Sequence, residues 1–157
     1  MRSAAFALAA LFALAGGVSA QTRPDYSGTW RLDLSRSDAA AHTDGPGPVN
    51  VTIVQTDAIV RIDTMTDRGT TSTTYRFAGT EPVSTDNPLA RWRGDTLLTD
   101  AVRDIRGQSV TVQQTRRLSG DGNEMIVESV INVQHGYSLT GAQTYSTSKD
   151  VFVRVRR

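Results

Sequence analysis

The residues best placed to do chemistry lie in segment 109–118, where two polar side chains interrupt an alternating apolar pattern. One parity of this segment holds Val110, Val112, Gln114, Arg116 and Leu118. Side chains two residues apart share one face of a β-strand. If that face points inward, Gln114 and Arg116 enter the protein interior, where buried polar groups need partners. A carboxylate or amide on a bound ligand would be such a partner.

A second interpretation of Gln114 and Arg116 needs no ligand. Both side chains would lie near an open rim in contact with water, or would pair with an acid such as Asp100 or Glu128. Buried arginine without a partner is rare. The residue types alone therefore favour this second interpretation, and the first stays open.

Catalytic and metal-binding patterns are weak in this sequence. His42 and His135 are not spaced as metal ligands, and the common nucleophile, zinc-protease and phosphate-loop motifs do not occur. Two pairs of aspartates four residues apart fit water-exposed turns better than an acid–base pair. The sequence predicts no catalytic residue, no metal site and no cofactor, and an enzyme is the less favoured class.

The first segment with a clear structural period is 25–34. Tyr26, Gly28, Trp30 and Leu32 alternate with polar residues, which is the pattern of a half-buried β-strand. Glycine beside tryptophan fits a bend where a barrel closes over a large ring. Similar patterns follow along the chain, and they predict strands near 49–53, 60–62, 70–77, 89–93, 96–103, 109–118, 124–133, 143–146 and 151–156.

Turn signals separate these segments at intervals of about ten residues. Gly94-Asp95 predicts a tight hairpin, and Ser119 to Asn123 is the clearest turn. Pro82 and Pro88 bracket a segment that belongs in a loop or at an edge. Because closure removes exposed edges, we expect an all-β fold: an antiparallel up-and-down meander of 8–10 strands closed into a small barrel, with a sandwich as the alternative.

A predicted targeting segment precedes the predicted barrel. Residues 1–20 combine a short positive end, an apolar run too short to span a bilayer and a small-residue cleavage site, which is typical of a secretory signal peptide. The expected mature domain is 21–157, in the periplasm or secreted, with no membrane insertion after cleavage. The chain has no cysteine, so an oxidising compartment would be tolerated but not exploited.

Charge disfavours two other classes of protein. Without Arg2 the mature chain would carry 16 basic and 16 acidic residues, which argues against a nucleic-acid partner. A transmembrane barrel would place charges on its lipid-facing side at about 2 kcal/mol or more each near the midplane. The charged residues of outward parity are Arg31, Asp33, Arg61, Asp63, Arg76, Arg91 and Arg93.

Three stretches give the chain a family resemblance. Gly28-Thr29-Trp30, on the first strand after an export signal, resembles the Gly-x-Trp opening of the lipocalins and related calycin barrels. Together with residues 90–98 and 118–129, it is similar to uncharacterised exported bacterial proteins of lipocalin-like type. The resemblance implies a barrel that closes by pairing its first strand with its last.

The resemblance also implies a contact at the closure. Lipocalins place an arginine from a late strand over the Gly-x-Trp ring, which here suggests Arg154 over Trp30, with Gly28 and Phe152 beside them. The parity of the last strand leaves an alternative, with Val151 and Val153 facing inward instead. We predict that Phe152 and Arg154 turn inward because phenylalanine is the larger apolar group.

The expected function follows from the fold. Small barrels hold one small ligand or fill their interior with side chains. The predicted ligand-binding residues are Tyr75, Phe77, Trp92, Gln114 and Arg116, for a small apolar or amphipathic ligand. The alternative is an envelope interaction or structural domain with a filled barrel, in which the aromatic residues are core. An interior cavity of about 300 Å³ or more would favour the binding module.

Overall fold

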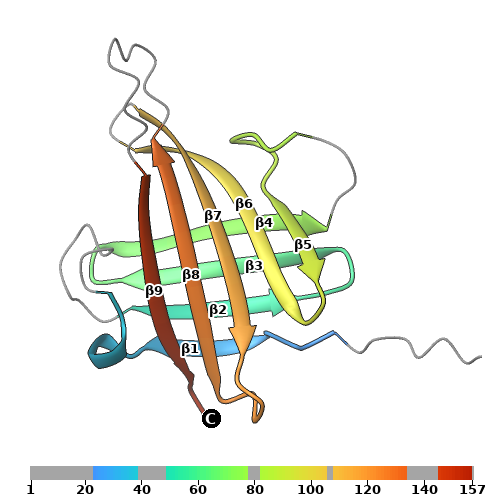
Figure 1. Cartoon of the computed structure of the whole chain (residues 1–157), viewed down its shortest axis with the longest axis vertical. Coiled ribbons are helices and arrows are strands. Elements are labelled where there is room, and N and C mark those ends of the chain that lie inside the picture. The colour runs from blue at the N-terminus through green and yellow to red at the C-terminus, as the bar shows by residue number, and fades with distance from the viewer. Residues whose placement is uncertain (1–22, 39–48, 78–81, 106–107, 134–144, 157) are drawn as a thin grey trace, which may run out of the picture.

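The computed structural model describes residues 23–38, 49–77, 82–105, 108–133 and 145–156, which form a closed β-barrel (Figure 1). The described residues contribute nine strands that follow one another around the barrel in chain order. The strands are β1 (Gly28–Leu32), β2 (Asn50–Gln55), β3 (Ile59–Thr66), β4 (Gly69–Phe77), β5 (Leu89–Arg93), β6 (Thr96–Ile105), β7 (Gln108–Leu118), β8 (Glu124–Val133) and β9 (Tyr145–Arg154). The predicted all-β barrel is confirmed.

The strand directions explain how an odd number of strands closes. Every neighbouring pair is antiparallel except β4 and β5, which run parallel, and β1 pairs with β9 to close the ring. In a purely alternating ring of nine strands, the first and last would be parallel. The single parallel pair restores an antiparallel closure, and the sequence pattern did not predict it.

The last strand differs from the prediction. The parts of the segments expected at 143–146 and 151–156 that lie within Tyr145–Arg154 belong to one strand, β9, which pairs with β8 from Tyr145 to Val153. Residues 143 and 144 lie outside the described residues. The first half of β9 is polar and exposed, so its sequence resembles a loop. Hydrogen bonding to β8 decides the structure there, because a ladder satisfies the backbone groups whatever the side chains are.

The turns at the lower end of Figure 1 agree with the sequence. Gly94 (φ 63°) lies in the two-residue β5–β6 connection, and Gly122 (φ 69°) lies in the β7–β8 turn. A 3-10 turn follows β1 at Leu34–Arg36, where Ser35 N donates to Asp33 Oδ1 at 3.1 Å.

The core lies at the lower end of the barrel. Tyr26 and Trp30 are fully buried there, packed with residues from both sides of the ring. Tyr26 Oη donates to the backbone oxygens of Arg116 (2.7 Å) and Asp95 (3.1 Å), and Trp30 Nε1 donates to Tyr26 O (2.9 Å). The segment before β1 therefore closes this end, because its ring reaches across to β7 and to the β5–β6 turn.

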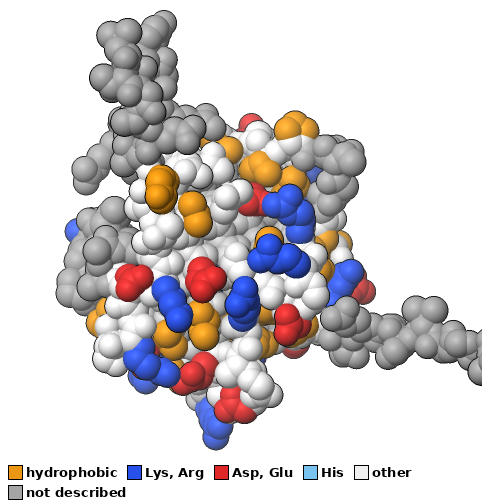
Figure 2. Space-filling model, in the orientation of Figure 1, with side chains coloured by type: hydrophobic (Ala, Val, Ile, Leu, Met, Phe, Trp, Pro, Cys, Tyr) orange, Lys and Arg blue, Asp and Glu red, His pale blue; other side chains and the backbone are white. Residues whose placement is uncertain are grey.

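The outer wall carries charges of both signs. On the face shown in Figure 2, basic and acidic side chains are interspersed over the described residues. Among the described parts of the chain, no helix is long and apolar enough to cross a membrane. The predicted signal peptide, residues 1–20, lies outside the described residues and stays a prediction.

Candidate ligand-binding site

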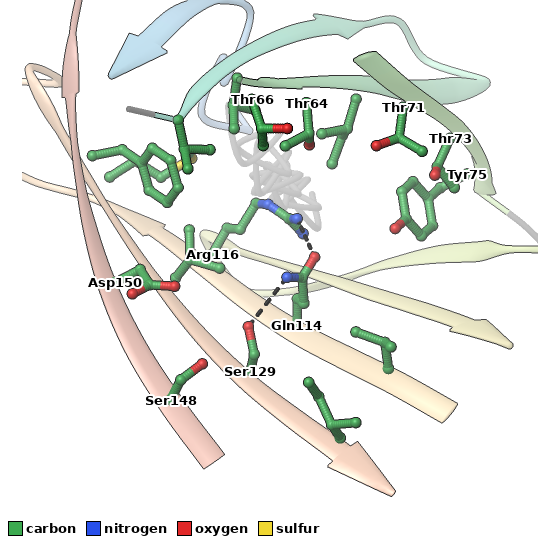
Figure 3. Close-up of a pocket in the computed structure, with 18 of the residues that line it drawn as sticks. Thr64, Thr66, Thr71, Thr73, Tyr75, Gln114, Arg116, Ser129, Ser148 and Asp150 are labelled. Atoms are coloured by element: carbon green, nitrogen blue, oxygen red, sulfur yellow. Dashed lines mark hydrogen bonds between the residues drawn. The ribbon is translucent and has the colours of Figure 1, made fainter. Parts of the chain in front are cut away.

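A cavity of about 260 Å³ lies inside the barrel above the closed end (Figure 3). Val51 and Ile62 line it on the side of β2 and β3, while Met125 and Phe152 line it on the side of β8 and β9. Hydroxyl side chains also line the wall, among them the labelled residues Thr64, Thr66, Thr71, Thr73, Ser129 and Ser148. The barrel is therefore not packed solid, although the volume is slightly below the 300 Å³ used as the sequence criterion.

Arg116 on β7 is the most deeply buried cation at this cavity, with 4% of the residue exposed. Its Nη1 donates to Thr99 Oγ1 at 2.6 Å, and its Nη2 donates to Gln114 Oε1. Gln114 Nε2 in turn donates to Ser129 Oγ at 3.1 Å (Figure 3). Gln114 and Arg116 therefore form one network that faces the cavity, as the first of the two sequence interpretations requires.

The charge of Arg116 is not balanced by an acid. Burial lowers the pKa of its guanidinium below the ordinary value, and the positive charge of Arg103 acts in the same direction. Among the described residues, no carboxylate lies within ion-pair distance of Arg116. The favoured sequence interpretation is therefore wrong, since Arg116 neither lies at a wet rim nor pairs with Asp100 or Glu128. Asp100 bonds to Arg91 instead.

The aromatic residues divide between the cavity and the closed end. Tyr75 lines the cavity, as predicted. Phe77 and Trp92 do not, because they stack on each other at 5.6 Å between ring centroids, and Tyr26 packs at 6.0 Å from Trp92. Arg23 lies over the Trp92 ring at 5.6 Å. Trp92 faces the core as expected, but it lies too low along the barrel axis to reach the cavity.

The predicted closure contact is present. The guanidinium carbon of Arg154 lies 4.1 Å from the centre of the Trp30 ring, well inside the 6 Å limit for a cation–π contact. Backbone oxygens take up its donors: Arg154 Nε donates to Gly122 O (2.9 Å) and Nη1 to Ser27 O (2.6 Å). Nη2 reaches Asp25 O at 3.3 Å. Arg154 therefore ties β9 to the start of β1 and to the β7–β8 turn.

Gly28 and Phe152 complete the closure as predicted. Gly28 has φ 132°, a conformation that other residues rarely adopt, and a Cβ there would lie 2.8 Å from Arg154 Nη1. Glycine is therefore required for the arginine to approach the backbone. Phe152 is buried and lines the cavity, so the inward parity of Phe152 is confirmed over that of Val151 and Val153.

Other polar residues behave as ordinary wall residues. Asp63 forms an ion pair with Arg61 at 2.8 Å, and no group of three His, Cys, Asp or Glu side chains within the described ranges could hold a metal ion. His42 and His135 lie outside the described residues. Sequence reasoning missed Thr99 and Arg103, although both share the inward parity of Leu97 and Ala101 on β6.

The comparisons with known proteins add no relative. No protein-family model matches the chain, and no curated protein matches it at a significant level. The lipocalin-like assignment therefore remains a prediction based on residues 27–33, 90–98 and 118–129.

Proposed function

We propose that the protein is an exported lipocalin-like binding module that holds a small, partly apolar anion in the barrel cavity. The observation that carries the proposal is Arg116, a buried cation that faces a cavity and contacts only neutral oxygens in the described structure. Burying an unbalanced charge is costly, and an anionic ligand would offset that cost. Arginine also presents its donors in a fork that fits a carboxylate or phosphate.

The side chains that line the cavity indicate which kind of anion would fit. Around Arg116 the cavity presents the side chains of Met125, Val127 and Phe152, so the body of the ligand should be apolar. Gln114 and Thr99 hold the guanidinium in place and leave part of its fork available. A small carboxylic acid with a hydrocarbon body meets these requirements better than a free inorganic anion.

The volume limits the size of the ligand. About 260 Å³ corresponds to the volume of roughly nine water molecules at about 30 Å³ each. A ligand of about ten non-hydrogen atoms fits this space, whereas drug-sized molecules need pockets of about 300–1,000 Å³. The proposed ligand is therefore smaller than a long-chain lipid.

A binding experiment with matched variants tests the proposal. Octanoate and its neutral counterpart octanol would be titrated by calorimetry into wild type, Arg116→Met and Arg117→Met. Arg117 is the control because it lies on the same strand with its side chain on the exposed face. We expect octanoate to bind wild type and Arg117→Met about tenfold or more tighter than Arg116→Met, from the loss of a charged hydrogen bond.

Native mass spectrometry of protein purified from its own source would identify the natural ligand. An anionic adduct of low mass on wild type that is missing from Arg116→Met supports the proposal. If no probe binds and no adduct is found, the alternative holds, and the protein is a structural or interaction domain of the cell envelope. Equal binding of octanoate and octanol would also contradict a role for the Arg116 charge.

A further inference from the structure

The barrel wall has a seam between β4 and β6. β4 pairs with β5 only at Arg76 and Phe77, and β6 pairs with β5 only from Thr96 to Asp100. Among the described residues, the facing edges of 69–75 and 101–105 therefore have no strand partner. This is the place where the two strands that flank β5 lack a ladder between them.

Pro88 explains why β5 does not fill the seam. Proline has no backbone N–H to donate to a ladder, so it cannot continue the strand toward the upper end of the barrel. Residues 84–87 turn back on themselves through a bridge between Ser84 and Asn87. A groove of about 590 Å³ results on the outside of the seam, lined in part by Thr74, Thr85, Pro88 and Val102.

Arg103 lies where this outer groove meets the inner cavity. It lines both spaces, as do Thr71 and Thr73, so the cavity and the groove share one boundary. The Arg103 guanidinium crosses the seam, and its Nη2 donates to Thr73 Oγ1 at 3.2 Å. That bond occupies one of five donors, and no carboxylate among the described residues pairs with Arg103.

We propose that the seam is a second anion subsite and that the ligand carries two acidic groups. One group binds Arg116 deep in the cavity, and the other binds Arg103 at the seam. This inference rests on the proposed function of the cavity. It explains why two arginines face one cavity while both side chains donate only to neutral oxygens.

The spacing of the two subsites determines the ligand length. Thr99, which positions the Arg116 guanidinium, and Arg103 are four residues apart on β6, or about 13 Å at 3.3 Å per residue. Both arginines extend into the same cavity, so their charged groups can lie closer than this. The distance to be spanned is the one between the two guanidinium groups. We expect a diacid of about eight carbons to reach both groups and a four-carbon diacid to be too short.

Nearby acids restrict where the charges can lie. Asp150 lines the inner cavity from β9, and Asp104 lines the outer groove next to Arg103. In Figure 3 the Asp150 side chain lies on the far side of the Arg116 stem from the guanidinium. An anion is therefore favoured at the two guanidinium groups and disfavoured along the β9 wall. Arg103 is only half-buried, so a second carboxylate at the seam can keep part of its hydration.

The test compares diacids with monoacids of equal length by calorimetry. Octanedioate, octanoate, butanedioate and butanoate would be titrated into wild type, Arg103→Gln, Arg103→Lys and the outward-facing control Arg117→Met. Glutamine has an amide donor but no charge, so Arg103→Gln removes the charge and leaves a polar side chain at the seam. We expect octanedioate to bind wild type about tenfold tighter than octanoate, as one added charged hydrogen bond would give.

Three further results are expected if the seam is the second subsite. Arg103→Gln should bind the two eight-carbon acids equally, Arg103→Lys should regain part of the preference, and butanedioate should gain nothing over butanoate. A preference that survives in Arg103→Gln, or that is equal for the short diacid, would overturn the inference. Octanoate binding as tightly as octanedioate to wild type would overturn it and leave the proposed function standing. If neither eight-carbon acid binds wild type, both proposals fail.

Discussion

Two arginines of this barrel are both desolvated to some degree but are held in different ways. Arg154 at the closed end donates to three backbone oxygens and lies 4.1 Å from the centre of an indole ring. Arg116 at the cavity donates to a hydroxyl and an amide oxygen of neighbouring side chains. The first arginine joins segments far apart in sequence, whereas the second joins side chains on adjacent strands.

The difference separates a role in stability from a role in binding. The partners of Arg154 are backbone groups that would otherwise need other donors, so the folded state gains when the arginine is present. The partners of Arg116 are adjustable side chains, and the buried charge itself opposes folding. We therefore expect substitutions at the closed end to reduce stability and substitutions at the cavity to change binding instead.

The largest expected effect is at the centre of the closed end. Trp30→Ala removes a fully buried ring and the surface on which Arg154 stacks, and it should lower the free energy of unfolding by about 3 kcal/mol or more. Urea unfolding followed by circular dichroism measures this change. Trp92→Ala is the comparison, because that ring is only partly buried. An equal loss of unfolding free energy in the two variants would mean that Trp30 contributes no more to stability than the partly buried Trp92.

A smaller loss is expected when the Arg154 charge is removed. Arg154→Met keeps most of the apolar stem but loses the cation–π contact and the bonds to Gly122 and Ser27. We expect about 2 kcal/mol of destabilisation by urea unfolding. Arg156→Met is the control at the exposed end of the chain and should change stability little. If the two variants unfold at the same urea concentration, Arg154 does not clamp the barrel.

Alkaline pH should weaken the closed end through Tyr26. Burial raises the pKa of the Tyr26 hydroxyl above its ordinary value, and the hydroxyl donates to backbone oxygens only while it is protonated. The folded pKa exceeds the unfolded one, so this stabilisation is fully present below about pH 10 and is lost as pH rises through the folded pKa.

Urea unfolding between pH 8 and 11 should show this additional loss in wild type but not in Tyr26→Phe. At neutral pH, Tyr26→Phe should itself cost about 1 kcal/mol because it removes buried hydrogen bonds. Tyr145→Phe, at an exposed position, should follow the wild-type pH dependence. The same alkaline loss in Tyr26→Phe would assign the effect to another group.

The sequence predicted the closed end better than the cavity, for a physical reason. Alternation identified the inward face of Trp30, and the size of Phe152 decided the parity of the last strand. For Arg116, alternation left two interpretations open, and the favoured one was wrong because the side chain is buried at the cavity. Alternation does not give the height of a residue along the barrel axis, so Phe77 and Trp92 were placed in the cavity although they pack below it. Height depends on strand register, which long-range pairing sets.

Local sequence patterns also did not predict the seam between β4 and β6. Pro82 and Pro88 correctly indicated a loop, but the parallel pairing of β4 with β5 depends on where the chain returns after that loop. The contribution of Arg103 follows from that pairing, because its partner Thr73 is 30 residues away. The pattern of β6 alone cannot identify this contact, because the contact lies where β4 and β6 have no ladder between them.

The smallest expected change in stability is at Arg116, and it provides the sharpest test of the comparison. In ligand-free protein, Arg116→Met removes a buried charge that no carboxylate balances in the described structure, and methionine retains apolar volume at the same place. Gln114 keeps its bond to Ser129, and the cavity can hydrate the hydroxyl of Thr99. We expect the free energy of unfolding to stay within about 1 kcal/mol of wild type, or to rise.

The measurement is urea unfolding of wild type, Arg116→Met and Arg117→Met after refolding from denaturant, which removes any bound ligand. If Arg116→Met loses 2 kcal/mol or more relative to Arg117→Met, its network with Thr99 and Gln114 stabilises the barrel much as Arg154 does, and the division between the two arginines is wrong. The same unfolding measurement in the presence of octanoate tests the role of Arg116 in binding. For this step, octanoate is added to all three proteins. Octanoate should raise the urea midpoint of wild type and of Arg117→Met and leave that of Arg116→Met unchanged. A ligand stabilises the folded state only if it binds that state.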